Sequence, residues 1–179
     1  KNKKMKLLYK KADTVLIKHL RRLDLASSNG IIEYPLVALK FLKSIAKKID
    51  KFGGGLLILD YGYLVKKNRS TLKSVKNHKY VNLLSSPHSV DITSYLNFDL
   101  FNKILINNNL NVKKTITQGE FLRKVGIMER ANILSKKMTF KEKANMYFRL
   151  KRLVDYNEMG NIFKVLFAQK KDNKFSLGF

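Results

Sequence analysis

One short segment constrains the fold more than any other part of the sequence: four consecutive apolar residues that follow three glycines. The glycines are residues 53–55, the apolar run is Leu56-Leu57-Ile58-Leu59, and Asp60, Tyr61 and Gly62 come next. An apolar run with these boundaries predicts a β-strand buried on both faces, which is typical of a parallel sheet covered by helices. Ligands in open α/β sheets bind beyond the carboxyl ends of such strands. We therefore expect Asp60, Tyr61 and Gly62 at a functional edge of a sheet.

The spacing of apolar residues predicts further elements on both sides of this strand. A helix is expected over residues 35–51, and Asn97 is expected to cap another helix. Capping-box spacing at Thr117–Glu120 and Thr139–Glu142 predicts two more helix starts. Further strands are expected over residues 80–83, 91–95, 112–117 and 162–168. Helices alternating with strands, and crowded toward the C-terminal half, indicate an α/β fold.

Length and composition exclude several classes of protein. The 179 residues fit one ordinary domain, and a hydrophobic fraction of 45% implies a packed core. Because there is no cysteine, the sequence has no disulfide, thiolate metal site or cysteine nucleophile. The three histidines lack the acidic or histidine neighbours of a helical metal site, and we expect no metal. No apolar run approaches the roughly 20 residues of a membrane span, so we expect a soluble, cytoplasmic protein.

The strong positive charge allows two interpretations. With 37 basic and 13 acidic residues, the net charge is +24, as for many proteins that bind nucleic acid. The excess is mostly lysine and is spread along the whole chain, which favours solvated surface lysines over bidentate phosphate contacts. A nucleic-acid-binding domain therefore stays an alternative, and nucleic acid is not the expected partner. Basic residues gather over residues 1–11 and in a second cluster: Lys136, Lys137, Lys141, Lys143, Arg149, Lys151 and Arg152.

Asp60 and Asp91 are the candidate catalytic carboxylates, because each lies at the edge of a predicted strand in a chain with few acids. A carboxylate in that position can hold a cationic ligand or accept a proton. The alternative is that each one caps a turn or pairs with a lysine. Both interpretations are left open by the residues alone.

Four segments, in the same order along the chain, resemble the MidA-type S-adenosylmethionine-dependent methyltransferases, a family that includes a mitochondrial complex I assembly arginine methyltransferase. Residues 53–63 resemble its G-G-x-x-L-x-x-D-Y-G-H segment, with Tyr63 in place of the histidine. Residues 91–98 resemble A-D-L-T-A-H-V-D-F, and residues 117–130 resemble T-Q-G-x-F-L-x-x-L-G-I-x-x-R. Residues 159–166, the fourth segment, resemble M-G-x-x-F-K-V-L. In addition to these four, residues 33–35 resemble the family's E-x-S-P helix start.

The resemblance implies a partial class I (Rossmann-like) methyltransferase sheet, with later strands only and helical insertions near the C-terminus. The family's glycine-rich cofactor loop, roughly E-x-G-P-G-x-G, does not occur in this sequence. Such a half sheet would expose an apolar edge and face where an N-terminal half, encoded separately or in a longer chain, would dock. S-adenosylmethionine is the implied cofactor, its binding residues are unknown, and we do not expect this chain to bind it unaided.

The resemblance also implies a function and a set of site residues. The function is methylation of a protein substrate's arginine when the N-terminal half completes the domain. An inactive remnant, or a complementing subunit of a split gene, is the alternative. Residues 1–30 would be a basic N-terminal segment, residues 31–168 part of the methyltransferase domain and residues 169–179 a basic tail. The proposed catalytic residues are Asp60, Tyr61 and Asp91, and the proposed substrate-binding residues are Gly62, Thr93, Gln118 and Arg130.

Overall fold

The computed structural model describes residues 6, 8–25, 31–65, 70–82, 84 and 89–179. The chain forms two compact units, and each is described by itself. The smaller unit comprises Lys1–Tyr34 and Val65–Tyr95, and the larger comprises Pro35–Leu64 and Leu96–Phe179. One of the three histidines, His88, lies outside the described residues, as does most of the basic segment at residues 1–11.

The described residues of the smaller unit form one helix and a three-stranded antiparallel sheet. The helix is α1, and the strands follow the order β3-β2-β4. The strand predicted over residues 91–95 is confirmed as β4, which ends at Thr93. Of the strand predicted over residues 80–83, Tyr80 lies in β3, Val81 and Asn82 do not lie in a strand, and residue 83 lies outside the described residues. The bounds of the elements are α1 Thr14–Arg22, β2 Lys73–Lys76, β3 Lys79–Tyr80 and β4 Asp91–Thr93.

The larger unit is a mixed sheet with helices, in which the strands follow the order β5-β1-β8-β6 and β7 also pairs with β8. β1 is antiparallel to β8 and parallel to β5. This mixed α/β sheet confirms the predicted fold class. The elements are α2 Leu36–Phe52, β1 Gly55–Tyr63, β5 Leu96–Asn97, α3 Phe98–Ile106, β6 Leu110–Val112, β7 Ile116–Thr117, α4 Gln118–Lys124, α5 Ile127–Ser135, α6 Phe140–Val154, α7 Met159–Ile162 and β8 Phe163–Lys170.

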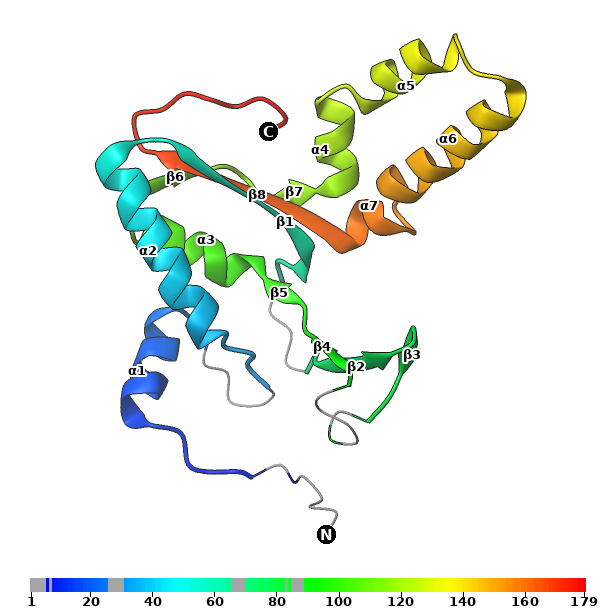
Figure 1. The fold of residues 1–179 in the computed structure, drawn as a ribbon. Coiled ribbons are helices and arrows are strands. Elements are labelled where there is room, and N and C mark those ends of the chain that lie inside the picture. Colours follow the sequence, from blue (N-terminus) through cyan, green and yellow to red (C-terminus); the bar gives the residue numbers. More distant parts are fainter. Residues whose placement is uncertain (1–5, 7, 26–30, 66–69, 83, 85–88) are drawn as a thin grey trace. The chain divides into compact units, whose positions relative to one another are not determined.

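The core of the larger unit lies where α2 and α3 cover one face of the sheet (Figure 1). The helix predicted over residues 35–51 is confirmed as α2, and Asn97 caps α3 through a bond from the Leu100 N–H to its Oδ1 at 3.1 Å. Burial of these apolar side chains is the main source of stability. Fully or nearly fully buried residues include Leu39, Leu42, Ala46, Phe98, Leu100, Ile104, Leu105, Val165, Leu166 and Ala168.

The opposite face of the sheet is only partly covered. The chain after β8 returns over this face, and the Phe167 ring contacts the rings of Phe175 and Phe179 at centroid distances of 5.4 and 5.5 Å. Leu57 and Leu59 on β1 are nevertheless 46% and 44% exposed. The prediction that this strand is buried on both faces is therefore wrong, because the described chain supplies helices to one face of β1 only.

The strand predicted over residues 112–117 is divided into β6 and β7. Both pieces pair with β8, but residues 113–115 between them leave the ladder. The Lys113 N–H still donates to the carbonyl oxygen of Phe167 at 2.9 Å. The Thr115 hydroxyl is bonded instead to Oδ1 of Asn102 on α3 at 3.1 Å. A buried polar group needs such a partner, and the strand is interrupted where Thr115 finds one.

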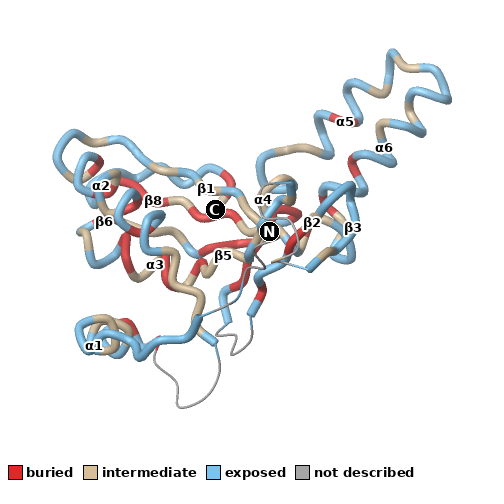
Figure 2. Tube along the Cα trace, turned by 60° about the horizontal axis from the view of Figure 1, so that its bottom comes forward, coloured by how far each residue is buried: buried red, intermediate tan, exposed pale blue. Residues whose placement is uncertain are grey.

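α5 and α6 form an antiparallel hairpin that projects from α4 and is mostly exposed (Figure 2). Its small core consists of Ala131, Leu150 and Val154 with neighbouring apolar residues. The predicted capping box at Thr139 is confirmed, because Glu142 bonds back to the Thr139 N–H at 2.8 Å. At Thr117 only half of the predicted box forms: Thr117 caps α4, whereas Glu120 pairs with Lys124 at 3.1 Å. Within the described ranges, no helix is long and apolar enough to cross a membrane.

The capping box makes the start of α6 sensitive to acid. The backbone and hydroxyl bonds from Thr139 lower the pKa of Glu142. A carboxyl group whose pKa is lower in the folded state than in the unfolded state stabilises the folded state at pH values above the unfolded-state pKa. This stabilisation is lost as the pH falls through the folded-state pKa. We expect the protection factors against hydrogen exchange in the first turn of α6 to fall over that acidic range in the wild type and much less in Glu142→Gln. An equal fall in both proteins would contradict this assignment.

Candidate functional site

Asp60 and Tyr61 occupy consecutive positions near the carboxyl end of β1 and point to opposite faces of the sheet, because side chains alternate along a strand. Asp60 is half-buried, and its Oδ1 accepts a hydrogen bond from the Tyr61 N–H at 2.8 Å. The Tyr61 ring meets the ring of Phe163, its cross-strand neighbour, edge-on at 5.8 Å. One side of this strand end thus offers a carboxylate and the other an aromatic ring.

Gly62 is the point where β1 approaches its neighbours most closely. The residue is buried and pairs with Leu96 of β5. A Cβ atom at this position would collide with the carbonyl oxygen of Leu96 and would lie 2.7 Å from the ring of Phe98. Gly62 therefore has a packing role, in that it lets β5 and α3 close against the strand that carries Asp60.

Among the described residues, no strand pairs with one edge of β1 over most of its length, and we call this the open edge. Residues 55–61 pair with β8 on one side, whereas β5 pairs only with Gly62 and Tyr63 on the other. The carbonyl of Phe167 accepts from Lys113, so the backbone polar groups of Phe167 face away from β1. Because Leu57 lies opposite Phe167, the N–H groups of Leu57 and Leu59 must face the open edge. This edge combines unpaired backbone groups with half-exposed leucines.

Asp91 and Thr93, the other predicted site residues, lie on β4 in the smaller unit. The strand register places them on the same face as Lys73 and Tyr80. Asp91 is exposed and Thr93 is half-buried. The Lys73 Nζ lies 3.3 Å from the Tyr80 Oη and 4.9 Å from the centre of the Tyr80 ring. This face of the sheet thus presents the Asp91 carboxylate and the Tyr80 ring, and the Lys73 ammonium group already lies over that ring.

Glu33 organises the smaller unit, a role that the sequence did not reveal beyond its match to a helix-start motif. Its Oε1 accepts from the Thr71 N–H at 2.6 Å, from the Leu72 N–H at 3.0 Å and from the Ser70 hydroxyl at 3.0 Å. Its Oε2 accepts from the Thr71 hydroxyl, whose oxygen in turn accepts from the Tyr95 N–H at 2.8 Å. One carboxylate thus joins the start of β2 to the end of β4 in the sheet that carries Asp91.

Replacing Glu33 with alanine is expected to loosen that sheet. Hydrogen bonds to a charged acceptor contribute about 1.5–3 kcal/mol each when buried, and those of Glu33 are partly exposed. We expect a local loss of about 2 kcal/mol, seen as roughly thirtyfold faster hydrogen exchange at Thr71 and Leu72. Glu33→Gln retains an acceptor and should have a smaller effect. Unchanged exchange in the alanine variant would contradict this role.

Gln118 and Arg130, predicted to bind substrate, lie in different environments. Gln118 is buried, and its Nε2 donates to the carbonyl oxygen of Leu153 at 2.9 Å. The Arg123 Nη1 donates to the next carbonyl, that of Val154, at 3.0 Å. These bonds satisfy carbonyls that the last turn of α6 leaves without helical partners. Gln118 therefore joins α4 to α6, whereas Arg130 is exposed on α5.

Gly119 and Gly160, both in the matched motifs, allow α4 and α7 to pack closely against the end of α6. A Cβ at Gly119 would lie 2.5 Å from the carbonyl oxygen of Val154. A Cβ at Gly160 would lie 2.5 Å from the carbonyl oxygen of Asp155 and would also collide with that of Val154. The T-Q-G and M-G motifs are thus accounted for by the junction of α4, α6 and α7.

The described residues do not provide the cofactor loop that the resemblance implies. Such a loop leaves a strand and opens a helix, with glycines that let a ligand approach the backbone. At the two described junctions that lead from a strand directly into a helix, Asn97–Phe98 and Thr117–Gln118, no residue intervenes. The glycines at 53–55 instead follow a helix and lead into a strand: Gly53 and Gly54 lie between α2 and β1, and Gly55 begins β1. We therefore derive no catalytic step through the cofactor.

Curated relatives of this chain are protein arginine methyltransferases. The chain is 27% identical over 124 residues to the mitochondrial NDUFAF7 protein of Xenopus tropicalis, covering 69% of this chain and 28% of the relative. It is 32% identical over 89 residues to the Caenorhabditis elegans homologue, covering 50% and 21%. With the Danio rerio protein it shares 25% identity over 144 residues, covering 80% and 32%. The chain thus spans about a third or less of each of these relatives.

Two solved structures from Burkholderia thailandensis have the same fold. One, of an uncharacterized protein, superposes with a TM-score of 0.75 at 20% identity and covers 94% of this chain and 46% of that one. The other, bound to S-adenosyl-homocysteine, has a TM-score of 0.73 at 21% identity and covers 93% and 44%. The described chain therefore corresponds in fold to less than half of each of these proteins.

A family model gives the assignment directly. The model described as "Putative S-adenosyl-L-methionine-dependent methyltransferase" matches residues 2–116, more than half of the chain. This span includes β1 with its Asp60-Tyr61-Gly62 end, and the strand β4 that carries Asp91. The chain belongs to the MidA-type family of S-adenosyl-L-methionine-dependent methyltransferases.

Proposed function

We propose that this chain is the later-strand part of a methyltransferase domain that methylates arginine in a protein substrate. The open edge of β1 carries the proposal. Its unpaired backbone groups and the half-exposed Leu57 and Leu59 suit a further strand, with covering residues, from an N-terminal half of the domain. That half, encoded separately or in a longer chain, would bring the glycine-rich cofactor loop.

The acidic residues have defined roles in this proposal. Transfer of a methyl group to a guanidinium nitrogen leaves that nitrogen with a proton to lose, and the cation must be held in line during attack. Asp60 in the larger unit and Asp91 in the smaller are the proposed groups that hold the cation or accept the proton. Tyr61 and Thr93 are proposed to align the substrate, and Gly62 to hold the strand end in place.

The names of the relatives support the proposed substrate. Each of the three relatives compared above is called a protein arginine methyltransferase. Asp91 and Tyr80 lie on the same face of the sheet, on either side of Val75 in β2, and a carboxylate and an aromatic ring on one face are suited to a planar cation. A peptide arginine is therefore the substrate group that we propose.

Calorimetry with S-adenosylmethionine tests the proposal. We expect no binding heat with this chain alone, and binding once the chain is co-purified with a segment that carries the glycine-rich loop, encoded by the upstream reading frame. A labelled methyl group should then appear on arginine of a test protein. Asp60→Asn should reduce this transfer more than Asp99→Asn, which removes a carboxylate from the half-buried ion pair with Lys103. Binding by the chain alone would contradict the proposal. Failure of the pair to bind would favour the inactive remnant.

A further inference from the structure

The outer surface of the α5–α6 hairpin is not explained by the proposed reaction. Along α6, Phe140, Ala144 and Phe148 recur at intervals of four residues and fall within about 80° of the helix circumference. Phe140 is 89% exposed and Phe148 is 71% exposed. We call these three residues, together with the adjacent Lys141, Lys151 and Arg152, the α6 outer stripe.

α5 packs against a different side of α6. Leu150 and Val154 are buried against Ala131, and Met146 packs beside them. The Tyr147 hydroxyl donates to Oδ1 of Asn132 at 2.9 Å, which also joins the two helices. On the helical wheel, Met146 and Leu150 lie about 160° from Phe148, whereas Tyr147 and Val154 lie about 100° and about 120° from it. The hairpin therefore uses one side of α6 for its own core and leaves the outer stripe exposed.

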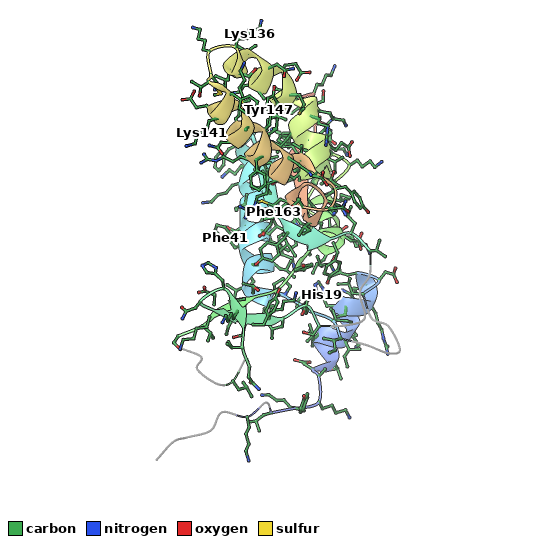
Figure 3. All side chains as sticks on the ribbon, turned by 90° about the vertical axis from the view of Figure 1, so that its right-hand side faces the viewer. His19, Phe41, Lys136, Lys141, Tyr147 and Phe163 are labelled. Atoms are coloured by element: carbon green, nitrogen blue, oxygen red, sulfur yellow. The ribbon has the colours of Figure 1, made fainter. Side chains whose placement is uncertain are left out.

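The charge of the hairpin is strongly unbalanced. Between residues 127 and 155, eight basic residues stand against three acidic ones. Glu142 is engaged by Thr139, and Asp155 accepts from the Asn157 N–H at 2.9 Å. In this fully described stretch, no lysine or arginine forms an ion pair. Figure 3 shows Lys136 and Lys141 extending outward near the hairpin tip. An acidic partner would supply the missing counter-charge.

We propose that the α6 outer stripe binds an amphipathic helix of a partner protein, with acidic residues flanking a narrow apolar seam. The width of the stripe favours a helix, because two packed helices share a seam of this kind. Its exposed phenylalanines provide the apolar anchors, and its lysines and arginine provide charge complementarity. This proposal concerns a partner surface and does not depend on methyl transfer.

Other occupants fit the stripe less well. A second copy of this chain would bring like charges together on a protein of charge +24. Phe140 and Phe148 are eight residues apart, about 12 Å along the helix, which is too far for stacking successive bases. A membrane-surface helix presents a broad apolar face, whereas the broad apolar side of α6 packs on α5.

The test uses the full 179-residue chain and a synthetic peptide with glutamates flanking a leucine seam, followed by fluorescence anisotropy. We expect binding that weakens about tenfold or more in Phe140→Ser/Phe148→Ser, and by a similar factor in Lys141→Glu/Lys151→Glu. All four side chains are exposed, so circular dichroism should show an unchanged fold. The matched control Lys40→Glu/Lys48→Glu reverses two exposed charges on α2 and should change binding less than about twofold.

Three results would overturn the proposal. Equal binding of a scrambled peptide of the same composition would show that charge alone is recognised. Equal weakening by the α2 control would show that the site is not on α6. Tighter binding to phosphatidylcholine–phosphatidylglycerol vesicles or to duplex DNA, lost in the phenylalanine variant, would assign the stripe to that ligand instead of a helix.

Discussion

Replacing Gly62 with alanine is expected to destabilise the larger unit by about 3 kcal/mol or more, because overpacking at a backbone contact cannot be relieved by side-chain rotation. The added methyl group would collide with the Leu96 carbonyl oxygen and lie 2.7 Å from the Phe98 ring. Phe98 is fully buried, so the ring has little room to move. Urea unfolding followed by circular dichroism measures the loss. The expected result is a large fall in the midpoint or failure to fold.

Gly126 provides a matched control for this substitution. It precedes α5 with a φ of 85°, and the nearest atom to an added Cβ lies 3.5 Å away. Gly126→Ala therefore adds backbone strain without a collision, for about 1 kcal/mol. If both substitutions lower the free energy of unfolding by the same amount, close packing is not the reason why Gly62 cannot be replaced by alanine.

Introducing charge on the open face of β1 is expected to prevent completion of the domain while leaving this chain folded. Leu57 and Leu59 are 46% and 44% exposed, so Leu57→Glu/Leu59→Glu should alter the stability of the isolated chain by about 1 kcal/mol or less. Once a partner segment covers them, each carboxylate would be buried without a counter-charge. We expect affinity for the N-terminal half to fall at least about a hundredfold.

Ile106 is the matched control for that pair. It is 57% exposed and lies at the end of α3 that leads into β6. β6 pairs with the edge of β8 that faces away from β1. Ile106→Glu should leave the affinity within about twofold of the wild type, measured by anisotropy with a labelled N-terminal half. Equal weakening by both variants would indicate a general effect of charge, and no weakening by the leucine variant would place the docking surface elsewhere.

The local elements were predictable because their signals are local. The apolar spacing of α2, the cap at Asn97 and the box at Thr139 each involve residues close in sequence, and each is confirmed. The half-formed box at Thr117 shows the limit of such signals. The Glu120 carboxylate could bond to the backbone N–H of Thr117 or pair with the side chain of Lys124, and it pairs with Lys124. Spacing alone does not decide between an N-cap and an ion pair.

Features that join distant parts of the chain were not predictable in the same way. Glu33 bonds to residues 37–39 positions away, and Gln118 bonds to a carbonyl 35 positions away. The face of Leu57 and Leu59 was predicted as buried because a four-residue apolar run has no polar alternation. Such a run indicates that both faces are meant to be covered, but not which chain segment covers them.

Hydrogen exchange along β1 tests the open-edge account most directly. Leu56 and Ile58 lie opposite Ala168 and Leu166 in the hydrogen-bonded pairs with β8, whereas the N–H groups of Leu57 and its alternate residue Leu59 face the open edge. In this chain alone, Leu56 and Ile58 should exchange slowly and the two open-edge amides quickly. With the N-terminal half bound, all four should be protected. Protection of the open-edge amides in the monomeric chain alone, or no added protection in the complex, would contradict the account.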